Sequence, residues 1–330
     1  MIQTTPPNGS SNYLSIESAD GALLESLSEA DIIPAFKRHG ALLFRGFRFD
    51  LNGLSQFTSR FCSRFVRNES GRRSQVSADG TTQSVNLGTE PFPLHPELSR
   101  VPWRPDVAWF ACASPPSADG ETLVCDGVQI AESLAETTRS ALLGRDVLYT
   151  EETPMGAFTE WLGIAPPDDA MLTRLSSESP FKFQRRDGRI FREFTRPFLH
   201  RPLFCERKAF GNFLLFARYM LGTQKFPTFE DGSIIPEKVA EEIREVSERL
   251  TVAHRWRTGD VLMLDNSRFL HGRNGVRDPA ERQIWTQFGY AAFLEEDDPR
   301  LAEPWRYTDD ALSIFFGPHA RDLAGTARAV

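Results

Sequence analysis

The hydrophobic positions of the chain follow two spacings, and each spacing predicts one kind of element. Apolar residues at helical spacing predict helices at residues 26–38, 51–65, 128–143, 204–221 and 236–250. Short apolar runs predict strands at residues 41–47, 94–99, 106–113, 121–126, 260–264 and 282–293. Strands therefore predominate at both ends of the chain, with helices between and around them.

Three segments follow neither spacing. Residues 1–14 are polar and rich in proline, serine and asparagine, which predicts a mobile or loosely docked lead-in, and residues 68–82 read as an exposed loop. Residues 147–207 are irregular and contain six prolines, so we expect a lid or substrate-binding insert there. The whole pattern favours a single β-rich domain over residues 1–330, with helical cover, rather than two domains.

Composition narrows the classes of partner. The chain has 330 residues, 40% of them hydrophobic, which is enough for a sizeable core, and its net charge of -7 argues against a nucleic-acid partner. Its four cysteines lack CxxC spacing and are expected to be reduced. Without a signal-like start or an apolar stretch of ~20 residues, a cytoplasmic protein that acts on a small molecule, away from membranes, is the expectation.

The stretch LHPELS at residues 94–99 carries the first candidate chemistry. In a strand, positions i and i+2 share a face, so His95 and Glu97 could converge on one ion, and His271 could supply a third ligand. Two histidines and one carboxylate form the facial triad of non-heme Fe(II) oxygenases. Zinc is the competing metal, although the HExxH pattern that usually accompanies a His2Glu zinc site is absent from the sequence.

Further residues follow this triplet in an informative order. Thr122 lies in GETLVCDG, His271 in DNSRFLHGR, and Arg282 in ERQIWTQFGY. With these motifs, from residues 39–47 through 281–290, the chain resembles the taurine dioxygenase and clavaminate synthase superfamily of Fe(II)- and 2-oxoglutarate-dependent oxygenases. The resemblance implies a mixed α/β, β-rich fold with a double-stranded β-helix (jelly roll, cupin-like) core and flanking helices.

The same resemblance implies roles for five residues. His95, Glu97 and His271 would be the metal ligands, and Arg282 and Thr122 would hold the far carboxylate of the cosubstrate 2-oxoglutarate, with dioxygen as the second cosubstrate. An arginine suits this task because its guanidinium is always charged and forks onto a carboxylate. Two neighbouring arginines, Arg273 and Arg277, compete with Arg282 as the anchor.

Departures from the family pattern bear on the substrate. Retention of a carboxylate at Glu97 favours hydroxylation or desaturation over halogenation, and Thr286 stands where a taurine-binding arginine would be, which argues against a small sulfonate. The HPELS flank resembles members that oxidise amino acids, free or tethered to a carrier protein, in natural-product pathways. Arg192 and Arg196 in FREFTRPF are candidates to bind a substrate carboxylate, with solvated surface charges as the competing interpretation.

Two other functions stay open from the residues. One is a non-catalytic cupin-like protein that binds a metal or ligand, and the other is a zinc hydrolase that uses the same three side chains. The 2-oxo acid anchor argues against a pure binding protein, and dependence on dioxygen separates an oxygenase from a hydrolase. The sequence does not determine the oligomeric state, and it is compatible with a homo-oligomer.

Overall fold

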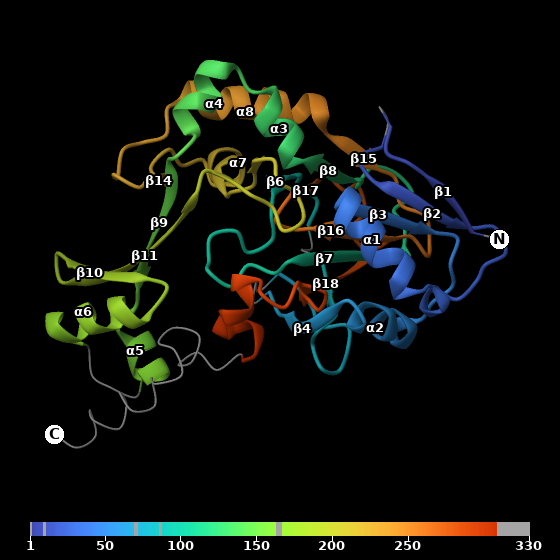
Figure 1. Ribbon diagram of the computed structural model, residues 1–330, viewed down its shortest axis with the longest axis horizontal. Helices are drawn as coiled ribbons and strands as arrows, with labels where there is room; N and C mark the ends of the chain where they lie inside the picture. Colours follow the sequence, from blue (N-terminus) through green and yellow to red (C-terminus); the bar gives the residue numbers. More distant parts are fainter. Residues whose placement is uncertain (1, 9–10, 69–71, 86–87, 163–166, 309–330) are drawn as a thin grey trace.

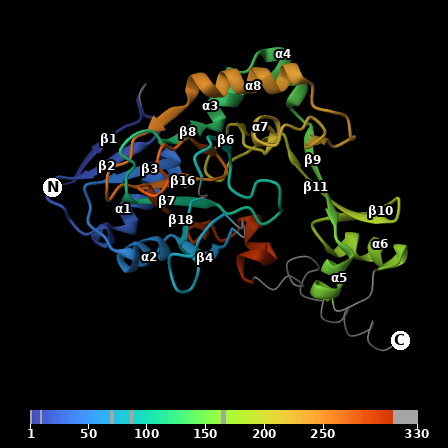
Figure 2. The same cartoon turned by 180° about the vertical axis from the view of Figure 1, so that it is seen from behind.

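The architecture consists of two facing β-sheets, helices on their outer sides, and a smaller unit that projects from one end (Figures 1 and 2). It is taken from a computed structural model, which describes residues 2–8, 11–68, 72–85, 88–162 and 167–308. The predicted mixed α/β, β-rich class is confirmed. No helix in these ranges has both the length and the apolar character that crossing a bilayer requires.

Short strands and helices make up much of the described chain. The strands are β1 (Ile2–Thr5), β2 (Leu14–Ser18), β3 (Ala41–Arg45), β4 (Cys62–Val66), β5 (Gln83–Ser84), β6 (Phe92–His95), β7 (Val107–Ser114), β8 (Thr122–Asp126), β9 (Asp146–Thr153), β10 (Lys182–Arg186), β11 (Arg189–Pro197), β12 (Leu199–His200), β13 (Ala209–Phe210), β14 (Thr228–Phe229), β15 (Val252–His254), β16 (Val261–Asp265), β17 (Phe269–Arg273) and β18 (Gln283–Ala291). The helices are α1 (Glu29–His39), α2 (Leu51–Ser59), α3 (Gly127–Ser133), α4 (Glu136–Leu142), α5 (Met155–Leu162), α6 (Asp169–Glu178), α7 (Leu214–Tyr219) and α8 (Glu237–Leu250), with short 3-10 turns at Leu24–Ser26, Pro299–Ala302 and Pro304–Arg306.

The two facing sheets carry the core of the molecule. The larger one has the order β1-β2-β3-β16-β7-β18-β4, with β5 beside β18, and the smaller one has the order β15-β8-β17-β6. Neighbours in the smaller sheet are antiparallel, as are β3, β16, β7 and β18 in the larger one. This topology brings the three sequence segments with candidate chemistry into adjacent strands.

Strand β7 shows that the larger sheet has an apolar layer on each of its two faces. Its odd-numbered residues from Val107 to Ala111 pack in a cluster with side chains of α1 and α2, and its even-numbered residues from Ala108 to Cys112 pack between the sheets. The alternation follows from the two-residue period of a strand. Because both faces are covered, β7 reads in the sequence as an unbroken apolar run.

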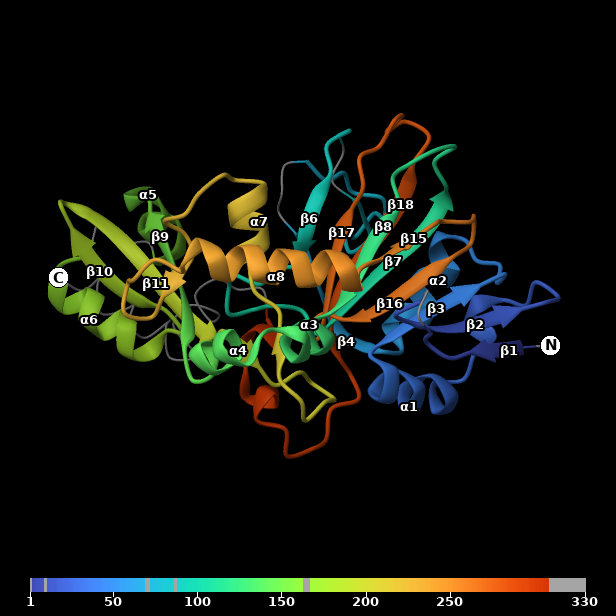
Figure 3. The same cartoon turned by 90° about the horizontal axis from the view of Figure 1, so that it is seen from above.

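A third apolar layer covers the other side of the smaller sheet. Side chains of α3, α7 and α8 pack there against residues of β6, β8 and β17. Helix α8 lies along this side and extends toward the projecting unit (Figure 3). It matches the predicted helix at residues 236–250, and its N-terminal neighbour is Pro236.

The segment predicted as irregular, residues 147–207, is instead largely regular. Strands β9, β10 and β11 join β14 in a separate four-stranded sheet, and α5 and α6 pack with it to form the projecting unit. The unit has its own apolar cluster, which consists of Phe158, Leu172, Leu175, Phe181, Phe183 and Ile190. The prediction of irregular structure fails because most of these prolines lie between helices and strands and do not interrupt them, with Pro197 at the end of β11.

Three helix predictions are corrected in their extent. Helix α2 ends at Ser59, and the rest of the predicted helix forms β4, which pairs with β18, so tertiary pairing overrides the local spacing there. The predicted helix at residues 128–143 is divided into α3 and α4, and the one at residues 204–221 is reduced to α7. The predicted helix at residues 26–38 is confirmed as α1, which Ser28 caps and Gly40, at φ 72°, ends.

The amino-terminal prediction is also corrected. Residues 1–14 are predicted to precede the ordered structure, but β1 pairs with β2 in antiparallel register from Ile2–Ser18 to Thr5–Ser15. All four β1 residues are exposed, so it is pairing with β2, and not apolar burial, that orders them. Residues 1, 9 and 10 lie outside the described ranges.

Candidate active site

His95 and His271 come together because their strands are neighbours. His95 is the last residue of β6 and His271 is the middle residue of β17, and the two lie directly opposite each other in the antiparallel register. Their ring centroids are 4.7 Å apart. The sheet therefore provides two imidazoles on one face from segments that are far apart in the sequence.

Glu97 reaches the histidines in a different way from the one that the sequence predicted. It lies in the turn that follows β6, not on the strand, and the next residue, Leu98, has φ 50°. Asn266 fixes the backbone of this turn: Glu97 N donates to Asn266 Oδ1 over 2.7 Å, and Asn266 Nδ2 donates to Glu97 O over 3.0 Å. The carboxylate oxygen Oε2 then lies 3.7 Å from His271 Nε2.

The three side chains form a set that could hold one metal ion. One ligand atom from each of His95, Glu97 and His271 lies within 4.8 Å of the other two. Two imidazoles and one carboxylate suit a divalent transition metal and leave further coordination positions open. The strand pairing places the two histidines, and the Asn266 contacts place the backbone of Glu97.

The protonation state of His95 also suits a metal ligand. Its Nδ1 donates to the Pro93 carbonyl oxygen over 2.8 Å, which leaves Nε2 with a lone pair. Burial, and the nearby His271, lower the pKa of His95 to about 4. The ring is therefore neutral near pH 7.

The Glu97 carboxylate is charged although it is buried. Burial alone raises its pKa, but the Arg73 guanidinium and the two imidazoles outweigh that effect, so the pKa of Glu97 lies well below its usual range. Arg73 Nη2 donates to Oε2 over 3.0 Å, and the Asn68 side-chain amide donates to Oε1. Both donors come from the segment around the predicted exposed loop at residues 68–82, where Arg73 is in fact 6% exposed.

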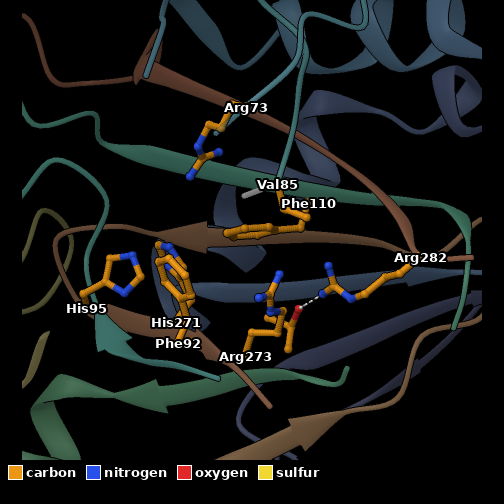
Figure 4. Close-up of a pocket in the computed structure, with 10 residues that line it drawn as sticks. Arg73, Val85, Phe92, His95, Phe110, His271, Arg273 and Arg282 are labelled. Carbon is orange, nitrogen blue, oxygen red and sulfur yellow. Dashed lines mark hydrogen bonds between the residues drawn. The ribbon is translucent and has the colours of Figure 1, made fainter. Parts of the chain in front are cut away.

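A cavity adjoins the candidate metal ligands. Its lining residues come from both sheets and from the segment before β6, and they are Arg73, Val85, Phe92, His95, Phe110, Thr122, His271, Gly272, Arg273 and Arg282. Figure 4 shows the two histidines on one side of it and Arg282 on the other, with the Phe110 ring between them. A small ligand could therefore reach the metal ligands and the arginine at the same time.

Arg282 and Thr122 form the far end of this cavity. Arg282 precedes β18, its Nε donates to Gly120 O over 2.8 Å, and its Nη2 donates to Thr122 Oγ1 over 3.2 Å. Trp256 Nε1 also donates to Thr122 Oγ1, over 3.0 Å, so the hydroxyl proton is left to donate elsewhere. Arg282 Nη1 is buried and has no hydrogen-bond partner among the described residues.

These contacts fit the far carboxylate of a dicarboxylic cosubstrate. A buried guanidinium with an unmatched N–H, next to a hydroxyl that can donate, presents two donors to an anion. Burial lowers the pKa of Arg282 to about 10, so the group remains charged near pH 7. Gly120, at φ 73°, permits the close approach, since a Cβ there would lie 3.1 Å from Arg282 Cδ.

The two competing arginines are placed differently. Arg273 lines the cavity, but its Nη2 donates to the backbone oxygens of Gly88 and Glu90 over 3.0 and 2.7 Å. The Arg277 side chain is 73% exposed and lies 3.5 Å from Asp119. Of the three candidates, Arg282 has the geometry of an anchor.

Arg192 and Arg196 do not line this cavity. They lie on β11 in the projecting unit, where Arg192 Nη2 donates to Glu151 over 2.7 Å and Arg196 Nη2 donates to Val101 O over 3.1 Å. The guanidinium of Arg196 lies over the Phe194 ring at 5.2 Å. Their predicted contact with substrate stays a prediction.

Sequence reasoning missed three residues of the site: Asn68, Arg73 and Asn266. Arg73 and Asn68 carry no motif that distinguishes them from loop residues, because their role depends on how the loop folds back onto Glu97. Asn266 had a weak signal, since it directly follows a buried strand and lies five residues before His271 in DNSRFLH.

Comparisons with known proteins identify the family of the chain. Residues 6–287 match the family described as "Taurine catabolism dioxygenase TauD, TfdA family". No curated protein matches the chain.

Solved structures share the fold at low sequence identity. The PvcB protein from Pseudomonas aeruginosa aligns over 87% of this chain and 91% of its own, with a TM-score of 0.58 and 16% identity. A taurine dioxygenase from Burkholderia xenovorans aligns over 88% and 89%, with a TM-score of 0.54 and 15% identity. AAD-2, solved with Mn(II) and N-oxalylglycine, aligns over 88% and 97%, with a TM-score of 0.57 and 14% identity.

These matches confirm the resemblance and the jelly-roll core predicted from the sequence. PvcB is described as an Fe, alpha-ketoglutarate dependent oxygenase. The chain belongs to the TauD/TfdA family and is an Fe(II)- and 2-oxoglutarate-dependent dioxygenase.

Proposed function

We propose that His95, Glu97 and His271 bind Fe(II), that Arg282 and Thr122 bind the far carboxylate of 2-oxoglutarate, and that the enzyme hydroxylates or desaturates an unactivated C–H bond of a small amino-acid-like substrate. The observation that carries the proposal is one cavity in which both groups meet. The candidate metal ligands lie on one side, and the buried, unmatched Nη1 of Arg282 lies on the other.

Each residue contributes a definable task. The neutral imidazole of His95 and the charged carboxylate of Glu97 bind a cation without first losing a proton near pH 7. The fixed guanidinium of Arg282 orients a dicarboxylate with its other end toward the histidines. Bound Fe(II) with 2-oxoglutarate and dioxygen supplies the oxidising power for the C–H bond.

The substrate class rests on less direct support. The family includes dioxygenases of small molecules, and PvcB, which shares the fold over 87% of this chain, is described as belonging to an isonitrile synthetic pathway. We therefore propose a substrate in natural-product biosynthesis, either a free amino-acid-like molecule or one tethered to a carrier protein. The projecting unit of β9, β10, β11, α5 and α6 is proposed as the lid over it.

Turnover of 2-oxoglutarate tests the proposed reaction. Purified protein with Fe(II) should form succinate from 2-oxoglutarate in air, slowly without substrate, and none under anaerobic conditions. Glu97→Ala should form none in either condition. Succinate formation by Glu97→Ala would contradict the ligand assignment, and hydrolytic activity that persists without oxygen and with zinc would favour the hydrolase.

A further inference from the structure

Arg73 is a buried cation beside the candidate metal ligands, and the proposed function uses it only through its contact with Glu97. Its side chain is 6% exposed, and it lines the same cavity as His95, His271 and Arg282. Figure 4 shows it entering the cavity from a different side than Arg282. A guanidinium is always charged, so a full positive charge is held at this place.

The hydrogen bonds of Arg73 leave part of its donor capacity unused. Nη2 donates to Glu97 Oε2 and Nη1 donates to Thr286 Oγ1, each over 3.0 Å. Nε is buried and has no hydrogen-bond partner among the described residues. A guanidinium carries five N–H groups, and leaving a buried one unmatched is destabilising, so an acceptor that arrives with a ligand would be favoured.

The net charge of the cavity also favours an anionic ligand. Three of the described residues that line it are arginines, Arg73, Arg273 and Arg282, and none is acidic. The charge of a divalent metal ion is offset by a 2-oxoglutarate dianion, and Glu97 offsets one guanidinium. Positive charge remains in excess, which an anionic substrate would balance.

Glu97 uses only part of the Arg73 guanidinium. The charge of Arg73 helps to keep Glu97 ionised and its Nη2 donates to Oε2, while Oε1 receives a hydrogen bond from the neutral amide of Asn68. The unmatched Nε of Arg73 serves neither task.

We propose that Arg73 binds a free carboxylate of the primary substrate, and that the substrate is consequently a small free acid and not a thioester on a carrier protein. The inference rests on the proposed function and narrows it. A carboxylate can accept from the planar guanidinium in a charged, two-pronged contact, whereas a thioester offers one neutral carbonyl oxygen. The Phe288 ring, 5.1 Å from the guanidinium carbon, holds the group in place.

Calorimetric titration with a minimal carboxylate tests the assignment. The protein is loaded with redox-silent Mn(II) and saturating 2-oxoglutarate, so that Arg282 is already engaged, and is titrated with propionate and with the isosteric, neutral propionamide. The wild type should bind propionate and should not bind propionamide. Arg73→Gln, which keeps an N–H donor for Glu97 but removes the charge, should bind propionate at least about tenfold more weakly.

Two variants complete the design. Arg277→Gln removes an exposed arginine near the rim and should bind propionate as the wild type does. Arg73→Lys keeps the charge and should retain more propionate affinity than Arg73→Gln. If Arg73→Gln also loses Mn(II), the test becomes the titration of Mn(II)-loaded Arg73→Lys, which should bind propionate and should not bind propionamide.

The outcomes separate this inference from the function on which it rests. Equal propionate affinity in Arg73→Gln and wild type, equal binding of propionamide, or no binding of propionate by the wild type would each overturn the role of Arg73. Loss of Mn(II) from both Arg73 variants would assign Arg73 to the positioning of Glu97 only, which also overturns it. Failure of the Mn(II)-loaded wild type to bind 2-oxoglutarate would instead overturn the proposed function.

Discussion

The sandwich cavity and the projecting unit differ in how many of their arginines are paired with acidic residues. In the cavity, Arg73 and Arg282 are buried, and each keeps a nitrogen without a partner among the described residues. In the projecting unit, arginines such as Arg186, Arg189 and Arg192 pair with acidic residues of the same small sheet. The cavity thus holds positive charge available for a ligand, whereas much of the charge in the projecting unit is neutralised where it stands.

The difference shows why abundance of arginine is a poor guide to a binding site. The sequence of β10 and β11 is far richer in arginine than the strands around the cavity. Exposed ion pairs contribute only about 0–1 kcal/mol each and present little net charge to a ligand. A single buried guanidinium with an unmatched donor has a larger effect on a bound anion.

The largest expected effect comes from the proposed metal ligands beside the cavity. Glu97→Ala and His271→Ala should each weaken Mn(II) or Fe(II) binding by more than about 100-fold, because each removes one of three ligands. Equilibrium dialysis with metal analysis measures this. His39→Gln changes a histidine outside the cluster and should bind metal normally; metal binding that survives Glu97→Ala would move the site elsewhere.

Loss of the cavity arginine at the far end should affect the cosubstrate and not the metal. Arg282→Gln should weaken 2-oxoglutarate binding by about 10- to 100-fold, since charge-assisted hydrogen bonds contribute roughly 1.5–3 kcal/mol. Titration of the Mn(II)-loaded protein with 2-oxoglutarate measures it, with Arg277→Gln as the exposed counterpart. Equal losses of 2-oxoglutarate affinity in Arg282→Gln and Arg277→Gln would contradict the assignment of the anchor to the buried arginine.

The residue that supports the Glu97 turn should have a smaller effect. Asn266→Ala removes hydrogen bonds to both backbone groups of Glu97 and one to Pro105 O. We expect metal affinity to fall about tenfold, as for other groups that orient a ligand. Asn266→Asp retains the acceptor for Glu97 N but loses the donors, so its metal affinity should lie between those of Asn266→Ala and the wild type. Unchanged metal affinity in Asn266→Ala would show that the turn keeps its conformation without the Asn266 side chain.

The sandwich also contains a buried carboxyl that should make stability depend on pH. Burial raises the pKa of Asp265 to about 6. From about pH 4 to pH 6 the unfolded state has lost a proton that the folded state keeps, so folding stability falls as pH rises through this window and is level above it. Relative to Asp265→Asn, which does not titrate, the wild type should lose about 1–3 kcal/mol across that range.

Thermal unfolding of both proteins at several pH values measures this difference. Asn keeps an acceptor for the backbone and hydroxyl groups of Ser267 that bond Asp265 Oδ1. A constant gap between the two melting temperatures from pH 4 to pH 7 would show that Asp265 ionises as it does in the unfolded chain.

The smallest effect is expected in the projecting unit. Arg192→Gln should change unfolding stability by about 0–1 kcal/mol, because its pair with Glu151 is partly exposed, and should leave KM for the substrate within about threefold. Steady-state kinetics with the identified substrate measures KM. A rise of tenfold or more would establish the substrate contact predicted from the sequence.

The three side chains of the candidate metal site could be picked out from the sequence, but not the contacts that place them, and the missing part has a physical reason. His95, Glu97 and His271 carry a recognisable order and chemistry, and strand pairing alone brings the histidines together. The predicted route by which Glu97 joins them was wrong, because a turn held by Asn266 replaces the expected strand. Such a turn depends on contacts between residues 169 positions apart, which local spacing does not report.

The helices and the projecting unit show the same limit. Helix α8 and strands β7 and β16 were predictable because their spacing agrees with their burial. Residues 62–66 have helical spacing but form β4, since an adjacent strand edge pairs with them. Arg73 belongs to a segment that reads as an exposed loop, and only its fold over Glu97 reveals that it is buried.

Anaerobic titration of the wild type with Fe(II) and then 2-oxoglutarate tests the proposed active site most directly. Chelation of the metal by the 2-oxo acid gives a weak visible charge-transfer band. The band should form in the wild type, form in Arg282→Gln only at higher 2-oxoglutarate concentration, and fail to form in His95→Ala. A wild-type protein that binds Fe(II) but develops no band with 2-oxoglutarate would contradict the assignment of the cavity to this chemistry.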